Sequence, residues 1–380
     1  MFMSHYATEV CKCPKDLLGP EDLDVGISYA NICSVLLKLG KYEEGKQNIL
    51  KALEIQNKCV GEYHENTSIY YGTLALCYSY LNEFELSEQY YYKAMSFFAE
   101  IYTENHPYIA SCFDGLGSLY YNQHKHKKAL QCYKRAIQIY FNIYKEENYN
   151  IAKLYNSIGL VYLDLSDYNN AKTNILKAYH IFNKEAMPIE ISIDFLTICN
   201  NLGFVLYSTG EYENAIHLYE RAIIINNETS PEDIGSLALL KNNIARAYHM
   251  LKQYSKSYAI QLEALKLQLQ YYGEFNHNTA RSYNNLGLIY LSRNDFVSAL
   301  EYLQKGLNIR QSLKGEYRID IADSHNNIGD LWYKQKQYKK ALESYNLSYG
   351  LYLSVFNKRN KKCLEVSKKI MKAKVKQLFN

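Results

Sequence analysis

The stretch SYNNLGLIYLSRNDFVSALEYLQKGLNI, residues 282–309, decides the fold, because its pattern of small and aromatic residues recurs along the chain. With Gly287 as the anchor, a small residue in the same context occurs eight times, at intervals of 42, 42, 42, 44, 42, 42 and 42 residues. Such a period is typical of a repeat protein, in which each unit buries its apolar face against the next. The anchors are Cys33, Ala75, Gly117, Gly159, Gly203, Ala245, Gly287 and Gly329.

Other positions of the unit are as regular as the anchor. The residue before the anchor is Ile or Leu in every unit, and the third residue after it is Leu, Tyr or Trp. The ninth residue after it is aromatic in seven units, with His126 as the exception, and the twelfth and nineteenth are small. Positions −4, −1, 0 and +3 share one stripe of a helix, and positions +12 and +19 share one face of another. Each unit is therefore predicted to be a hairpin of two helices with a turn near +7.

The pattern Asn-x-Gly/Ala-x-x-Tyr, followed by an aromatic and two small residues, resembles the tetratricopeptide repeat. Ordinary repeats of this kind are ~34 residues long. The 42-residue period and loops such as YTENHPYIA (102–110) are similar to the longer repeats of kinesin light chains. The resemblance implies an all-α, right-handed superhelical solenoid of about eight repeats. No long heptad segment precedes the repeats, so we do not expect a motor subunit.

The pattern divides the chain into three parts. Residues 1–25 form an N-terminal segment that we expect to be partly loose, residues 26–357 form the eight-repeat solenoid, and residues 358–380 form a basic C-terminal capping helix. This last part holds nine Lys or Arg against one acid, whereas the whole chain has a net charge of +4. A cap covers the last hairpin and presents a polar outer face. The residues expected to face that hairpin are Leu364, Met371, Val375 and Leu378.

No pattern of a catalytic or cofactor-binding site occurs in the sequence. P-loop, H-E-x-x-H, G-x-S-x-G and EF-hand patterns are absent. The nine cysteines include no C-x-x-C pair, so neither a zinc site nor a disulfide framework is indicated. The turn His124-Lys125-His126 offers two imidazoles but no further ligand nearby in sequence. We therefore expect a non-enzymatic protein without a cofactor or a metal.

Candidate binding residues lie on the first helix of each unit, on the side opposite the buried stripe. Asparagine occupies positions −3 and −2 in consecutive units, although it is a mediocre helix former. Its amide both donates and accepts hydrogen bonds, which suits gripping the backbone of an extended peptide. The resemblance to kinesin light chains, in which groove asparagines hold cargo peptides, implies the same role here. The predicted peptide-binding residues are Asn156, Asn200, Asn242, Asn243, Arg246, Arg281, Asn284, Asn285, Asn326 and Lys334.

Two alternatives to this assignment stay open. The asparagines can instead bond neighbouring helices, and the cations can be solvated surface charge. If Arg246 and Arg281 do line a groove, their guanidinium groups favour an acidic peptide or a carboxylate. Replacing Asn242, Asn284 and Arg246 together with alanine is then expected to abolish partner capture with little change in melting temperature.

The sequence thus predicts a scaffold or adaptor that binds an extended partner segment in a concave groove. The alternatives are a regulatory repeat portion of a larger multidomain protein and a peptide-sensing regulator. The expected partner is a protein or peptide, with no nucleic acid and no small-molecule substrate. No run approaches the roughly 20 apolar residues of a membrane span, and the first residues lack the apolar core of a secretory signal. We therefore expect a cytoplasmic location.

Overall fold

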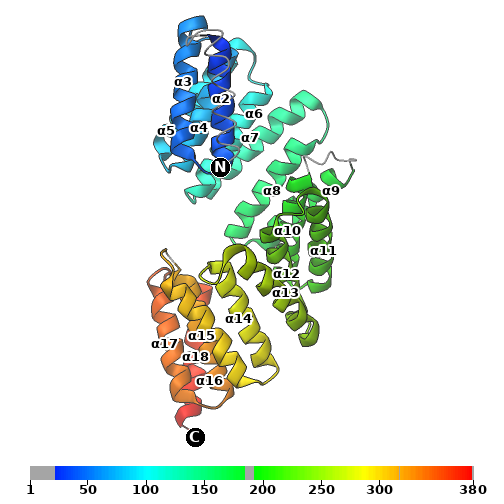
Figure 1. The fold of residues 1–380 in the computed structure, drawn as a ribbon, viewed down its shortest axis with the longest axis vertical. Helices are drawn as coiled ribbons and strands as arrows, with labels where there is room; N and C mark the ends of the chain where they lie inside the picture. The colour runs from blue at the N-terminus through cyan, green and yellow to red at the C-terminus, as the bar shows by residue number, and fades with distance from the viewer. Residues whose placement is uncertain (1–21, 185–191, 316, 379–380) are drawn as a thin grey trace. The chain divides into compact units, whose positions relative to one another are not determined.

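The protein is built from helical hairpins that follow one another along the chain (Figure 1). The computed structural model describes residues 22–184, 192–315 and 317–378, and these contain seventeen α-helices and no strand. The prediction of a partly loose segment at residues 1–25 falls largely on residues 1–21, which lie outside the described ranges. The chain divides into two compact units, Met1–Ala186 and Met187–Asn380.

The first unit contains four hairpins, coloured blue to green in Figure 1. Each pairs a first helix of 16 residues with a second helix of 17 to 19 residues. The pairs are α2 (Leu23–Lys38) with α3 (Tyr42–Val60), α4 (Glu65–Tyr80) with α5 (Phe84–Ile101), α6 (Pro107–Asn122) with α7 (His126–Tyr144), and α8 (Tyr149–Asp164) with α9 (Tyr168–Lys184).

The second unit contains four more hairpins and a final helix. Its helices run from green to red in Figure 1. The pairs are α10 (Ser192–Thr209) with α11 (Tyr212–Thr229), α12 (Ile234–Met250) with α13 (Tyr254–Tyr272), α14 (His277–Ser292) with α15 (Phe296–Ser312), and α16 (Arg318–Lys334) with α17 (Tyr338–Leu353), followed by α18 (Lys361–Leu378).

The turn between the two helices of a hairpin has the same geometry in every repeat. The residue at +7 has a positive φ, between 55° and 90°, in all eight turns. The N–H of the residue at +8 then donates to the carbonyl at +3, over 2.8 to 3.0 Å, which is the long hydrogen bond of a Schellman helix end. Every second helix begins at +9, where seven of the eight residues are aromatic. The turn and the aromatic column therefore fix where each hairpin folds back.

The small columns of the repeat let the two helices of a hairpin approach closely. All eight anchors and all sixteen residues at +12 and +19 are buried. In α14 and α15, a Cβ added to Gly287 would lie 2.6 Å from Cγ of Leu303 and 3.1 Å from the carbonyl oxygen of Ala299. The anchor has no room for a side chain there. These contacts confirm the prediction of an all-α array of paired helices.

The first helices form the inner layer of each unit. In the first unit α4 packs on α6 and α6 on α8, and in the second unit α10, α12, α14 and α16 pack in series. Neighbouring second helices make little or no such contact in the described ranges. Because a curved stack brings its inner elements closer together, the first helices line the concave side of each unit.

Helix α18 packs against α17, but through a different face from the predicted one. It buries Cys363, Val366 and Ala373 in the cluster that includes Tyr345 and Tyr352. The predicted face was wrong, because Leu364, Met371, Val375 and Leu378 are 48%, 65%, 53% and 83% exposed. The buried face follows the 42-residue register of the array, since Val366 and Ala373 correspond to the buried Ser324 and Leu331.

None of the described helices has both the length and the apolar composition that crossing a bilayer requires.

Candidate functional site

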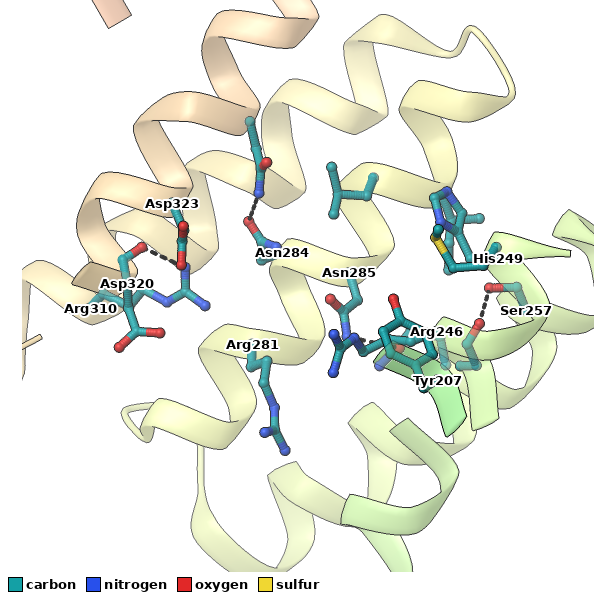
Figure 2. A pocket seen from close by; sticks show the side chains of 16 residues that line it. Tyr207, Arg246, His249, Ser257, Arg281, Asn284, Asn285, Arg310, Asp320 and Asp323 are labelled. Atoms are coloured by element: carbon teal, nitrogen blue, oxygen red, sulfur yellow. Dashed lines mark hydrogen bonds between the residues drawn. The ribbon is translucent and has the colours of Figure 1, made fainter. Parts of the chain in front are cut away.

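A cavity of about 380 Å³ lies on the inner layer of the second unit (Figure 2). Six helices from four consecutive hairpins contribute to its wall, namely α10, α12, α13, α14, α15 and α16. The wall is rich in polar and charged side chains. Those on which the chemistry of the cavity depends are Tyr207, Arg246, His249, Arg281, Asn284, Asn285, Arg310, Asp320, Asp323 and Asn327.

The predicted asparagines of the second unit bond to one another across neighbouring first helices. In each case an amide at −2 donates to an amide oxygen at −3 of the preceding repeat, 43 residues earlier. Helix α18 continues the series with a lysine, since Nζ of Lys369 donates to Oδ1 of Asn326 over 3.0 Å. The amide pairs are Asn243 to Asn200 (3.1 Å), Asn285 to Asn242 (2.8 Å) and Asn327 to Asn284 (3.0 Å).

These amide pairs are largely removed from solvent. Asn242 is fully buried, and Asn243, Asn284 and Asn285 are less than a tenth exposed. The pair of Asn242 and Asn285 also contacts Gln261, whose amide donates to the hydroxyl of Ser282. The amides therefore hold neighbouring hairpins in register, which is the alternative role that the sequence leaves open.

We expect the replacement Asn285→Ala to lower the free energy of unfolding by roughly 1–2 kcal/mol, because it removes the 2.8 Å donor to the buried Asn242 oxygen. Asn308→Ala, at an exposed position of α15, is the control and should change it by less than about 0.5 kcal/mol. Urea denaturation of the two variants measures the difference. Equal stabilities would show that the amide pairs do not join the hairpins. The triple replacement of Asn242, Asn284 and Arg246 is accordingly expected to destabilise the chain.

Arg281 is the least satisfied charged group of the cavity. Its Nε and Nη2 are buried and have no hydrogen-bond partner among the described residues. Burial, followed by the nearby charges of Arg246 and Arg310, lowers the pKa of Arg281 to about 10, so the guanidinium stays charged at neutral pH. Figure 2 shows the side chain of Arg281, which belongs to α14, near that of Arg246. A buried cation of this kind is costly unless an anion reaches it.

The other two arginines have partners of their own. The guanidinium of Arg246 lies over the ring of Tyr207, 4.7 Å from its centroid. Arg310 is 4% exposed, and its Nη1 donates to the backbone oxygen of Asp320 (2.9 Å) and to the hydroxyl of Ser324 (2.6 Å). Arg310 thus ties the end of α15 to the start of α16, whereas Arg281 has no comparable anchor.

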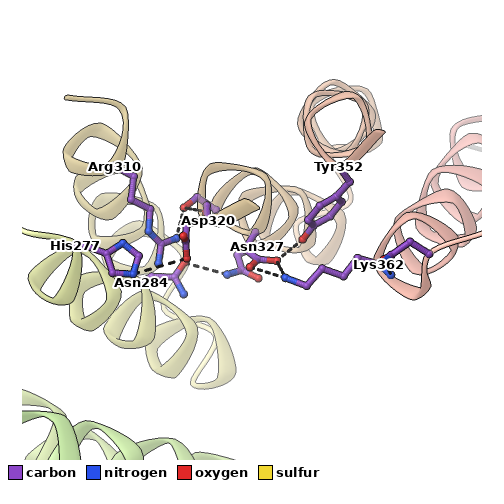
Figure 3. A network of polar contacts seen from close by, with 10 residues as sticks. His277, Asn284, Arg310, Asp320, Asn327, Tyr352 and Lys362 are labelled. Carbon is purple, nitrogen blue, oxygen red and sulfur yellow. Dashed lines mark hydrogen bonds and ion pairs between the residues drawn. The ribbon is translucent and has the colours of Figure 1, made fainter. Parts of the chain in front are cut away.

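The two carboxylates of the cavity differ in their contacts, and Figure 3 shows that of Asp320 with His277. Asp323 accepts hydrogen bonds from the hydroxyl of Tyr352 and from Nζ of Lys362, which lies 2.9 Å from Oδ2. Oδ1 of Asp320 is 4.0 Å from Nε2 of His277. Within the described ranges no ion pair joins either carboxylate to Arg281. Asp320 favours the charged form of Arg281 only at a distance, so among the described residues this cationic end of the cavity has no ion-paired counter-ion.

The remaining predicted residues lie outside this cavity. Asn156 is on α8 in the first unit. Asn200, Asn242, Asn243 and Asn326 belong to the series of amide hydrogen bonds in the second unit. Lys334 is exposed, and its Nζ donates to the carbonyl of Leu291 over 3.2 Å. Four of the ten predicted residues thus line the cavity or its rim directly, namely Arg246, Arg281, Asn284 and Asn285.

Sequence reasoning missed several lining residues, among them Tyr207, His249, Asp320 and Asp323. It also missed Arg310, for which a signal exists at position +23. The other seven repeats have an uncharged residue there, so the arginine stands out in the sequence, and the structure buries the position in all eight repeats. The column reads Gln56, Phe98, Tyr140, Phe182, Asn226, Gln268, Arg310 and Tyr352.

Family models named tetratricopeptide repeat match residues 24–100, 83–141, 152–183, 195–233 and 236–312, which together are more than half of the chain. The chain belongs to the tetratricopeptide repeat family. This fold is typically a non-catalytic interaction scaffold, and no catalytic family is indicated. The assignment made from the repeat columns is confirmed.

Individual relatives are more distant. The amyloid protein-binding protein 2 of Rattus norvegicus and that of Mus musculus are each 35% identical to the chain over an alignment of 101 residues, and the match covers 24% of this chain and 17% of the relative. The chain thus matches about a sixth of the length of these relatives.

Solved structures show a similar architecture at low sequence identity. The apo form of RapI covers 94% of this chain and 99% of its own, with a TM-score of 0.63 and 15% identity. A putative kinesin light chain from Podosopora anserina with nearly identical repeats covers 55% and 99%, with a TM-score of 0.47 and 16% identity. The likeness to RapI shows the fold.

Proposed function

We propose that the protein is an interaction scaffold whose second unit binds an extended segment of a partner protein, with an acidic group of that segment placed against Arg281. The observation that carries this proposal is the pair of unpartnered nitrogens, Nε and Nη2, on the buried guanidinium. The membership of the repeat family supports the scaffold role. A cytoplasmic location belongs to the same proposal.

A carboxylate is the anion that matches these two nitrogens. Nε and Nη2 form one edge of the planar guanidinium, and the N–H groups of that edge donate parallel hydrogen bonds to both oxygens of a carboxylate. The nearby Arg246 and Arg310, whose charges lower the pKa of Arg281, would be offset by the same anion. Binding an acid therefore relieves a repulsion that the free protein contains.

An extended segment fits the shape of the site better than an isolated ion does. The wall is drawn from four consecutive hairpins, so an occupant that runs along the inner layer meets several repeats in turn. Beside the arginines the wall offers the ring of Tyr207 and the side chain of Met250, which is 45% exposed. A segment with an acidic residue next to an apolar one would match this combination.

The hydrogen-bonded asparagines would contribute to binding mainly by fixing the register of the helices that carry the arginines. Asn242 is fully buried, so its contribution to binding would pass through Asn285. Asn326 and Lys334, which are less buried, would each exchange the hydrogen bond to Lys369 or Leu291 for one to the segment.

A peptide selection tests the proposal. A random peptide library is panned on the full chain, and each enriched peptide is resynthesised with its Asp and Glu residues replaced one at a time by Asn and Gln. We expect enriched sequences to share an acid whose amide analogue binds at least about 30-fold more weakly, since a buried charged pair contributes about 2 kcal/mol or more. Enriched peptides that tolerate every amide replacement would contradict the assignment.

A further inference from the structure

The turn between α6 and α7 brings two histidines next to an aspartate of the following hairpin. Nδ1 of His124 lies 3.6 Å from Oδ2 of Asp164, and Nε2 of His126 lies 3.9 Å from the same oxygen. The potential ligand atoms of the three residues all lie within 4.8 Å of one another. We propose that His124, His126 and Asp164 form a binding site for a divalent transition metal, with Zn²⁺ as the best match.

The ligand set fits zinc in type and in number. Imidazole and carboxylate ligands bind Zn²⁺ at about 2.0–2.2 Å, which places the donor atoms of a tetrahedral site roughly 3.4 Å apart. The two histidine–aspartate separations, 3.6 and 3.9 Å, are slightly larger, and the two imidazoles offer nitrogens within 4.8 Å of each other, so side-chain rotations, chiefly of the exposed His124, would close the site. Two imidazoles disfavour Mg²⁺ and Ca²⁺, which prefer oxygen ligands. Water would supply the fourth ligand.

One of the proposed ligands, His126, is an exception to the repeat pattern. Position +9 is Tyr or Phe in seven repeats, and His126 replaces it in the third. The imidazole packs beside the ring of Tyr121, 6.4 Å between centroids, as the aromatic at +9 packs beside Tyr207 or Tyr333 in other repeats. The packing at +9 thus requires only an aromatic ring. A histidine meets this requirement and adds a nitrogen that faces Asp164.

Each ligand comes from a well-defined backbone position. His124 has the positive φ of the turn (55°), and its side chain is 80% exposed, so it is free to rotate toward a metal. The side chain of His126 is 20% exposed and starts α7, and Asp164 ends α8. Because the aspartate belongs to the next hairpin, a bound metal would join two neighbouring repeats of the first unit and stabilise their packing.

The chain supplies isosteric or pattern-restoring variants for the test. His126→Phe restores the aromatic of the other seven repeats, His124→Asn places at +7 the residue found at Asn82 and Asn294, and Asp164→Asn removes only the charge. The untagged 380-residue chain is titrated with ZnCl₂ by calorimetry, and with CoCl₂ while the visible absorption of bound Co²⁺ is recorded. MgCl₂ is the control for nonspecific cation binding.

We expect the wild type to bind one equivalent of Zn²⁺ saturably, to show the absorption of low-coordinate Co²⁺, and to melt at a higher temperature with zinc. Each of the three variants should lose the saturable isotherm and the zinc-dependent rise in melting temperature while it keeps the helical circular dichroism of the wild type. Absence of saturable binding in the wild type would overturn the proposal. So would Zn²⁺ binding of unchanged affinity in any one of the three variants.

Discussion

Replacing Arg281 with methionine is expected to weaken the binding of an acidic segment by about 30-fold or more while it stabilises the free protein. Methionine keeps the apolar stem and much of the length of arginine but has no charge. Loss of one member of a buried charged pair costs about 2–5 kcal/mol of binding free energy, which is a factor of about 30 to several thousand.

The gain in stability has a separate physical origin. In the free protein the Nε and Nη2 groups of Arg281 are buried without partners, and the charges of Arg246 and Arg310 oppose its positive charge more than Asp320 favours it. Removing that charge should raise the free energy of unfolding by about 1–3 kcal/mol. Calorimetric titration with a selected peptide and urea denaturation measure the two effects on the same sample.

Two further variants separate charge from geometry. Arg281→Lys keeps the charge but loses the bidentate edge, so we expect an affinity between those of the wild type and the methionine variant. Arg318→Met removes an exposed charge at the start of α16 and should alter neither quantity beyond about 0.5 kcal/mol. A methionine variant of Arg281 that is less stable than the wild type and still binds would assign Arg281 a structural role instead.

Ala299→Phe is expected to lower the free energy of unfolding by about 3 kcal/mol, near the upper end of the usual cost of overpacking. Ala299 is fully buried where α15 approaches α14, and a Cβ on the facing Gly287 would already lie 3.1 Å from its carbonyl oxygen. A phenyl ring there has to push the two helices apart. Urea denaturation measures the loss.

The matched control lies two residues away on the same helix. Val297 is 81% exposed, and Val297→Phe adds a ring that solvent accommodates, so the stability should stay within about 0.5 kcal/mol of the wild type. Equal effects of the two phenylalanines would mean that the small columns do not set the spacing between helices.

The fold could be predicted from the sequence because the same pattern of small and aromatic residues occurs in eight repeats. A small residue at Gly287 or Ala299 alone has many explanations, but the same columns at a 42-residue period have one, namely close helix pairs. The buried face of the last helix, α18, was harder to predict, because this helix carries two apolar stripes. Its buried face, with Val366 and Ala373, is chosen by the register of the array and not by the larger side chains of Met371 and Leu378.

The site could be predicted in part. The columns place Arg246 and Arg281 on the inner layer, and both line the cavity. The hydrogen-bond partners of the amides could not be predicted from the sequence, because an asparagine at −3 can equally well bind a partner segment or the next repeat. Asp164 lies about one repeat beyond His124 and His126, so its proximity depends on how hairpins stack. Such contacts between repeats can be identified only from the three-dimensional structure.

The central claim, that Arg281 receives an acidic group of a partner segment, is tested most directly by a double-mutant cycle. Arg281→Met is combined with the acid-to-amide change in a selected peptide, and all four affinities are measured by calorimetry. The account predicts a coupling free energy of at least about 1.5 kcal/mol between the two changes, as for charge pairs in contact. Effects that add to within about 0.5 kcal/mol would contradict it, because they would place the acid away from Arg281.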